Sequence, residues 1–284
     1  MLRSVSNHYY SVKFKVTMQY SFLQQCEEEL VPTVEILWEI SRRLNLAEGE
    51  SLADFRQQVE QFGGFSENLE LPQKVAQISQ FFYRQLGYSD APESWIKAQR
   101  IAIDQVAAYR TGVPLVMAVL LQECAQHHNL DLQVVDFPGY PLLKLVDEQK
   151  TYFVDPQSGE FVRYQEVMER FEDVMEGDAE FCWDWAEPTP QKNLVEAYLT
   201  ELKHCLMAEA RYEKALQCVQ MLLTLQPDDP YEIRDRGYLF EELDCQHVAV
   251  DDYQYFVDQC PDDPSAELLK LQLESYAGPQ HLFH

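Results

Sequence analysis

A repeat of fixed spacing near the C-terminal end constrains the fold of this chain more than any other feature. The tetrapeptide Pro-Asp-Asp-Pro at 227–230 returns at 261–264, a period of 34 residues, and Ala215 corresponds to Ala249 within the two units. That period is typical of a repeat made of two helices. Because one helix pair cannot bury its own apolar face, such repeats need further repeats or a supporting surface. The sequence therefore predicts a helical repeat region over 189–284, docked on a preceding domain, with the tetrapeptide aspartates capping the helices that follow.

Residues 18–188 read as a mostly helical domain with one small antiparallel sheet, so the predicted fold class is α+β. Apolar periodicity predicts helices at 20–30, 33–44, 51–62, 71–86, 91–109, 114–128 and 164–175. Extended runs at 132–135, 142–146 and 152–154 predict three short strands, and 181–190 predicts an ordered, tryptophan-bearing connector. Residues 1–17 lack acids and a continuous apolar run. They are expected to form a disordered arm, or to precede a true start at Met18.

Three residues of the stretch 110–155 stand near the ends of a predicted helix and of the predicted strands that follow it. Pro114 opens an apolar helix, Tyr140 lies between the first two strands, and Asp155 follows the third. This layout resembles a transglutaminase-like (papain-like) catalytic core. In such a core a thiolate sits in the first turn of the helix, an imidazole on the next strand and a carboxylate one strand further on.

Together with the repeats, these motifs resemble the bacterial SirB-one family of transglutaminase-like proteins with tetratricopeptide repeats. The resemblance covers roughly residues 20–275 and is strongest at 110–156 and 210–264. Members of that family usually carry a histidine at the place of Tyr140 and a serine at the place of Val116. The resemblance implies a cytoplasmic protein without an established biochemical activity, often labelled a regulator.

The residues at the three catalytic places do not support hydrolytic chemistry. Proline carries no nucleophile, and an unperturbed tyrosine titrates near about 10, too high for a general base at neutral pH. Asp155 has no imidazole to orient, so we expect it to cap a turn or to pair with a basic neighbour such as Arg110. Cys124 lies three turns into the apolar helix and is expected to be buried and inert. The sequence thus predicts no catalytic residue, no cofactor and no metal site.

The composition limits which binding partners and which cellular compartment we expect. A formal charge of -26 opposes direct binding to nucleic acid or to an anionic membrane surface. Seven cysteines without a CxxC pair indicate free thiols in a reducing compartment, hence the cytoplasm. No apolar run is long enough to predict a membrane span.

Two functional hypotheses from different classes follow. The first is a non-catalytic protein-interaction or regulatory module that binds a protein or peptide, and the acidic charge of the chain favours a basic one. The alternative is a hydrolase or transferase with an unrecognised site around Arg110, Tyr140 and Asp155. The residues expected around the vestigial site, which is also the candidate ligand-binding site, are Arg110, Gly112, Pro114, Pro138, Gly139, Tyr140 and Asp155.

Overall fold

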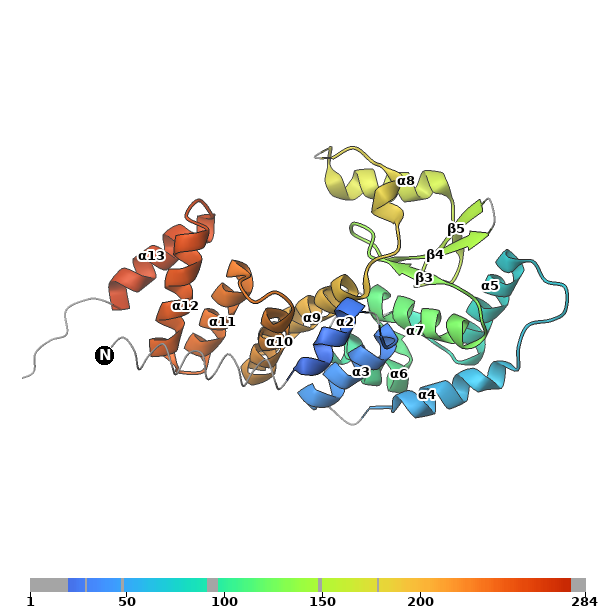
Figure 1. The fold of residues 1–284 in the computed structure, drawn as a ribbon, viewed down its shortest axis with the longest axis horizontal. Coiled ribbons are helices and arrows are strands. Elements are labelled where there is room, and N and C mark those ends of the chain that lie inside the picture. Colours follow the sequence, from blue (N-terminus) through green and yellow to red (C-terminus); the bar gives the residue numbers. More distant parts are fainter. Residues whose placement is uncertain are drawn as a thin grey trace, which may run out of the picture. The chain divides into compact units, whose positions relative to one another are not determined.

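The computed structural model describes residues 20–28, 30–46, 49–90, 97–147, 150–177 and 179–276 (Figure 1). Within these ranges the chain forms two compact units, one of residues 26–198 and one of residues 20–25 with 199–276. The division falls ten residues after the boundary predicted at 188/189. The predicted N-terminal arm, 1–17, and the proposed start at Met18 lie outside the described residues.

The first unit is mostly helical, as its apolar periodicity predicted. Its helices are α3 (Thr33–Leu44), α4 (Leu52–Val59), η2 (Glu60–Phe62), α5 (Leu71–Gln80), the π-helical turn η3 (Phe81–Gln85), η5 (Ala98–Arg100), α6 (Ile103–Tyr109), α7 (Pro114–His127), α8 (Tyr164–Met175) and η6 (Trp183–Ala186). Two further helices, α2 (Gln25–Glu28) and α9 (Gln191–Ala208), run across the division between the units. The helix predicted at 91–109 was wrong as one element: residues 91–96 lie outside the described ranges, and η5 and α6 are separate.

Local signals set where several of these helices begin. A reciprocal capping box between Ser51 and Asp54 starts α4. Pro114 occupies the first turn of α7, where its missing N–H costs no hydrogen bond. Helix α7 is buried on nearly every side, from Leu115 to Ala125, with Gln122 as the exception. It is therefore the central helix of this unit, as predicted.

A four-stranded antiparallel sheet completes the unit, with the order β3 (Gln133–Val135), β4 (Leu142–Asp147), β5 (Lys150–Val154) and β6 (Phe161–Val162). The three predicted strands are confirmed. The fourth was missed because two residues are too short to show an alternating pattern. A separate parallel pair, β1 (Ser89–Asp90) with β2 (Thr111–Gly112), was also not predicted.

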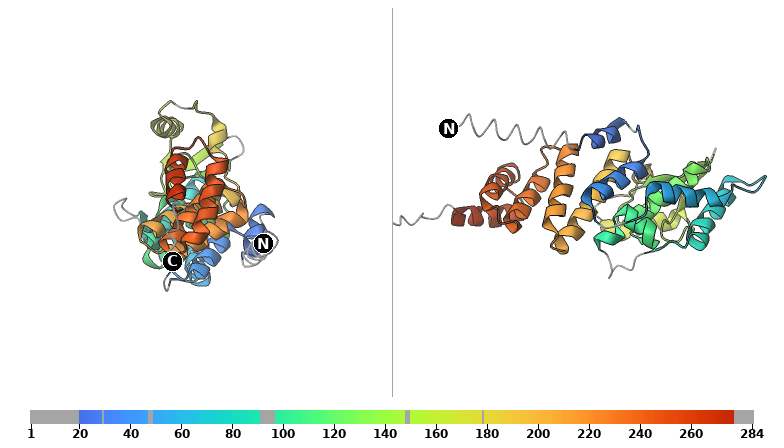
Figure 2. Two further views of the ribbon diagram at one scale, coloured as in Figure 1. Left: turned by 90° about the vertical axis from the view of Figure 1, so that its left-hand side faces the viewer. Right: turned by 90° about the horizontal axis from the view of Figure 1, so that it is seen from below.

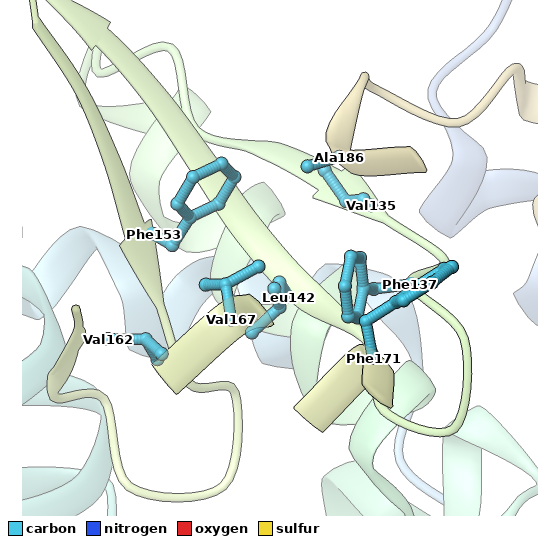
Figure 3. Packing of buried hydrophobic residues seen from close by; sticks show 8 residues of the cluster. All are labelled: Val135, Phe137, Leu142, Phe153, Val162, Val167, Phe171 and Ala186. Carbon is cyan, nitrogen blue, oxygen red and sulfur yellow. The ribbon is translucent and has the colours of Figure 1, made fainter. Parts of the chain in front are cut away.

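Both faces of the sheet are covered, by α8 on one side and by α7 on the other (Figure 1). Accordingly, the four consecutive residues Leu142–Leu145 are all buried. On the α8 side, Leu142 and Phe153 of the sheet pack with Val167 and Phe171 of α8 (Figure 3). Strand β5 thus delivers its C-terminal end, and Asp155 after it, to the edge of this packed layer.

The second unit consists of η1 (Ser21–Gln24), the last residues of α9, and the helices α10 (Tyr212–Leu225), α11 (Pro230–Glu242), α12 (Gln246–Gln259) and α13 (Pro264–Tyr276). Successive helices pack from α10 to α13, and η1 packs on α10 (Figure 2). Asp229 accepts hydrogen bonds from two backbone N–H groups at the start of α11, and Asp263 accepts one at the start of α13. The capping prediction is therefore confirmed, while docking of the repeats on the preceding domain stays a prediction.

No helix within the described ranges is both long and apolar enough to cross a membrane. The predicted α+β fold class, mostly helical with a small antiparallel sheet and followed by a helical region, is confirmed.

Candidate functional site

Asp155 lies directly after β5 and is held by its own turn. Its Oδ1 accepts the backbone N–H of Gln157 at 2.8 Å, and its Oδ2 accepts Nη2 of Arg170 at 3.2 Å. Its side chain is 13% exposed. Asp155 therefore caps a turn and pairs with a basic neighbour, as predicted, but the partner is Arg170 of α8 rather than Arg110.

Tyr140 lies in the turn before β4 and is held by the same guanidinium. The Arg170 guanidinium carbon lies 4.7 Å from the centre of the Tyr140 ring. Burial, followed by the negative charge of Asp155, raises the pKa of Tyr140 to about 12. The phenol is therefore protonated at neutral pH and does not accept a proton.

The preceding turn brings its backbone close to α8. Pro138 is half-buried, and Gly139 has a φ of 72°, in the region that favours glycine. A Cβ on Gly139 would lie 2.3 Å from Cγ2 of Val174. Gly139 is thus required both by its backbone angle and by the close approach of α8.

Tyr83 and Asp90 extend the group formed by Tyr140, Asp155 and Arg170. The Tyr83 hydroxyl donates to the carbonyl of Pro156 at 2.5 Å. Burial first, and then the charges of Asp155 and neighbouring groups, raise the pKa of Tyr83 far above its ordinary value. Asp90 is one of those charges, and it also acts on Tyr140.

Gly112 joins the edge of this group through strand pairing, because β2 aligns it with Asp90 of β1. A Cβ on Gly112 would lie 2.5 Å from Cγ1 of Val106, so only glycine fits between this strand and α6. Pro114 follows two residues later as the first residue of α7.

Arg110 contacts a different set of side chains. It ends α6 in a left-handed conformation, with a φ of 59°. Its guanidinium carbon lies 4.9 Å from the centre of the Tyr88 ring, and its Nη2 donates to Oε1 of Gln58. Among the described contacts of Arg110, none is with Tyr140 or Asp155. The structure thus brings Tyr140 and Asp155 together through Arg170 and gives Arg110 other partners.

The sequence alone missed Arg170, Tyr83 and Asp90. A signal for Arg170 was present, because it is a lone cation in an acidic helix and stands beside the buried positions Val167 and Phe171. At such a position, the aliphatic part of an arginine is expected to lie along the packed face while its guanidinium reaches a polar partner. Which partner it meets depends on the sheet.

The environments of Cys124 and His128, two other reactive side chains of the first unit, are those of structural residues. Cys124 is buried within α7, and burial raises the pKa of its thiol far above the ordinary range, as expected of an inert cysteine. His128 contacts the carbonyl of Val59 through Nε2 at 3.1 Å. Within the described part of the chain, no three histidine, cysteine or carboxylate groups are arranged to hold a metal ion.

Comparison with known families agrees with both units of the fold. The model of the transglutaminase-like superfamily matches residues 46–200, more than half of the chain. The chain belongs to the transglutaminase-like superfamily. In this transglutaminase-like protein, a tetratricopeptide-repeat model also matches residues 202–274, which include α10 to α12 and most of α13.

Relatives of this transglutaminase-like protein occur in several bacteria. A UPF0162 protein of Vibrio cholerae is 35% identical over 196 residues, covering 68% of this chain and 72% of its own. A UPF0162 protein of Pasteurella multocida is 30% identical and covers 77% and 83%. Protein SirB1 of Salmonella typhimurium is 28% identical over 254 residues, 89% of each chain. The resemblance to the SirB-one family is confirmed. No solved structure matches the chain significantly.

Proposed function

We propose that this protein is a non-catalytic interaction module, in which a transglutaminase-like core and tetratricopeptide repeats bind a protein or peptide. The observation that carries the proposal is the double contact of Arg170. One guanidinium lies over the Tyr140 ring and pairs with the Asp155 carboxylate. Both side chains that stand at the places of a catalytic base and its orienting carboxylate are therefore engaged in structural contacts.

A hydrolase or transferase built on Arg110, Tyr140 and Asp155 has less support. Catalysis by such a group needs its members within reach of one substrate atom. Arg110 is engaged with Tyr88 and Gln58 instead. Pro114 supplies no nucleophile, and Cys124 is buried.

An aromatic surface on the first unit supports protein binding. We use this name for the exposed rings of Tyr164, Trp183 and Trp185, which are 47%, 44% and 43% exposed. Tyr164 contacts Trp183 at 5.2 Å between ring centres, and Trp183 continues through Phe181 and Phe171 to Trp185. Tryptophan and tyrosine are enriched among the residues that dominate binding energy at protein interfaces.

The charge around this surface favours a basic partner. Residues 160–187 contain ten carboxylates and two arginines, a formal charge of 2 − 10 = −8. Carboxylates beside exposed aromatic rings attract lysine and arginine side chains both by charge and through the ring faces. We propose a basic protein segment as the partner, and no direct contact with nucleic acid.

The proposed site of action is the cytoplasm, and any regulatory role would pass through this protein contact. The cysteines of the described residues, from Cys26 to Cys260, are all free thiols, which fits a reducing compartment.

Cross-linking of the full-length chain in extract of its native host, followed by mass spectrometry, tests the proposal. The variant Glu169→Lys/Asp173→Lys reverses two exposed charges on α8, and Glu213→Lys/Glu267→Lys makes the same change on exposed positions of the repeats. We expect the α8 variant to recover at least fivefold less of the cross-linked partner than the native chain and than the repeat variant. Equal recovery by all three would remove the basic-segment proposal.

Incubation of the full-length chain with activated acyl substrates tests the non-catalytic half separately. Intact-mass measurement should show no covalent adduct at any side chain. An acyl adduct that turns over would overturn it, whatever the partner proves to be.

A further inference from the structure

An open cavity of about 870 Å³ lies in the first unit, between α3, α4 and the start of α6. It is rich in carboxylates. Its charged lining residues are Glu35, Glu39, Glu50, Glu60, Asp104, Arg42 and Arg56. The lining therefore carries a formal charge of 2 − 5 = −3.

The two arginines of the lining are already engaged. Arg42 Nη2 lies 2.7 Å from Oε1 of Glu39. Arg56 Nη2 lies 3.0 Å from Oε1 of Glu35, and its Nε lies 2.6 Å from Oε1 of Glu123. These pairs neutralise Glu35 and Glu39. The negative charge that remains in the cavity belongs to the other three carboxylates.

Those three carboxylates, Glu50, Glu60 and Asp104, take part in no ion pair among the described residues. Asp104 is only 8% exposed, and no described residue donates a hydrogen bond to its buried Oδ1. Among the described residues, Oε2 of Glu50 also has no donor, although its Oε1 accepts from Gln58 and the charge of Arg110 acts on this carboxylate. A buried acceptor left without a donor destabilises the folded chain, and a cationic donor would remove that cost.

The backbone of Gly49 and Glu50 lies very close to Asp104. A Cβ on Gly49 would lie 2.5 Å from Oδ2 of Asp104, so only glycine allows this segment to lie against the carboxylate. The backbone N–H of Glu50 also donates to the Asp104 carbonyl at 3.1 Å. Asp104 is thus positioned by its surroundings, with one oxygen left over.

Trp38 adds an aromatic ring to the same lining. Its Nε1–H donates to the carbonyl of Glu50 at 2.8 Å, which fixes the indole beside the carboxylates. Carboxylates together with an indole are the groups that recognise guanidinium and ammonium ions. A metal ion is a poorer match, because the described residues contain no set of three ligating groups close enough to hold one.

We propose that this cavity binds an organic cation: the guanidinium or ammonium group of an arginine or lysine side chain, or of a free polyamine. The recognition chemistry is the same for each source. Asp104 and Glu50 supply the acceptors, and Trp38 supplies the ring. The proposal does not depend on the aromatic surface of α8 and η6, which lies on other elements.

Calorimetric titration of the full-length chain tests the binding. The probes are an acetylated, amidated Gly-Arg-Gly peptide, its neutral citrulline analogue, and spermidine. We expect the arginine peptide to bind at least tenfold tighter than the citrulline peptide. Tighter binding of the peptide than of spermidine assigns the site to a protein side chain, and the reverse order assigns it to a polyamine. Equal binding of the arginine and citrulline peptides would overturn the proposal.

Two further measurements place the binding in the cavity. Glu50→Gln/Asp104→Asn should weaken binding of the cationic probes at least tenfold. Glu67→Gln/Asp131→Asn makes the same change of charge at exposed positions outside the cavity and outside α8, and should leave affinity within twofold. In nitrogen-15 spectra of the native chain, the Trp38 indole signal, assigned with Trp38→Phe, should shift on saturation. Equal loss in both variants, or an unmoved Trp38 signal, would show general attraction to an acidic protein and sink the proposal.

Discussion

At the scale of single residues, Arg170 connects two of the residues expected at the candidate site, Tyr140 and Asp155. Its guanidinium lies over the Tyr140 ring and pairs with Asp155, at positions 30 and 15 residues earlier in the chain. A guanidinium is always charged at ordinary pH and presents several donors in a fixed plane. Asp155 and Tyr140 therefore form part of the support between the sheet and α8.

Replacement of Asp155 by alanine should reduce stability by about 1–3 kcal/mol, because a part-buried ion pair and a turn hydrogen bond are both lost. Urea unfolding of Asp155→Ala, Arg170→Met and the double variant measures this. The double variant should lower the free energy of unfolding by less than the sum of the two single variants, because the two side chains contact each other. Additive effects would contradict the pairing, and unchanged stability of Asp155→Ala would contradict its structural role.

The raised pKa of Tyr140 gives an alkaline signature. Its pKa is about 12 in the folded chain, against about 10 when unfolded. The folded state therefore holds the phenolic proton more tightly, so the related stability is complete below about pH 10 and is lost as pH rises toward 12. Urea unfolding at pH 8 and pH 11 should show a smaller alkaline loss for Tyr140→Phe than for the native chain. Tyr109→Phe, at an exposed position, is the control and should behave like the native chain.

At the scale of elements, Glu241 joins three helices of the repeat unit. Its carboxylate on α11 accepts hydrogen bonds from Tyr253 of α12 and from Gln272 and Tyr276 of α13. Burial opposes ionisation of Glu241, but these three donors outweigh it and lower its pKa. The resulting stability is present above the unfolded pKa of about 4.3 and is lost as pH falls through the lower folded value.

Glu241→Gln should therefore weaken the repeat unit at neutral pH by about 1–2 kcal/mol, since hydrogen bonds to a charged acceptor are replaced by weaker ones. The difference between variant and native should shrink as pH falls below about 4. Circular dichroism during urea unfolding at pH 7 and pH 3.5 measures both values. A difference that is constant with pH would mean that the carboxylate charge contributes nothing.

Close packing of α11 on α12 depends on Gly237. A Cβ at this position would lie 2.8 Å from Cε1 and 2.9 Å from Cδ1 of Tyr253. In an open helix, glycine to alanine gains about 1 kcal/mol from helix propensity. Here the clash should reverse the sign, so Gly237→Ala should lose about 1–3 kcal/mol. Stabilisation of Gly237→Ala in thermal unfolding would contradict the close contact.

At the scale of the whole molecule, the charge of -26 means that the excess carboxylates repel one another. Excess charge of one sign destabilises a compact state, and about 0.1 M salt screens charges more than about 10 Å apart. The melting temperature should therefore rise by several degrees between 0.02 and 0.3 M sodium chloride at pH 7.5. Sucrose of matched osmolality, which leaves charges unscreened, is the control. A melting temperature that falls with salt would mean that local ion pairs outweigh the repulsion.

Most of the architecture could be predicted from local patterns. Pro114 begins a buried helix, and Asp229 and Asp263 cap the helices that follow them. Each of these features depends on groups a few residues apart. Strand β6 and the pairing of Asp90 with Gly112 could not be predicted, because two-residue strands carry no alternating pattern and exist only through their partners.

The sequence by itself determined most of the helices, the repeat period, the excess of carboxylates, and the proline at position 114. Only the tertiary structure decided that Arg170 holds Tyr140 and Asp155, that Arg110 stacks on Tyr88, and that three carboxylates with no ion pair in the described part of the chain share a cavity with an indole. The physical reason is the distance along the chain over which each kind of interaction acts. Backbone propensity and capping act within about a turn, whereas the partner of a charged side chain is chosen by the packing of elements far apart in the chain.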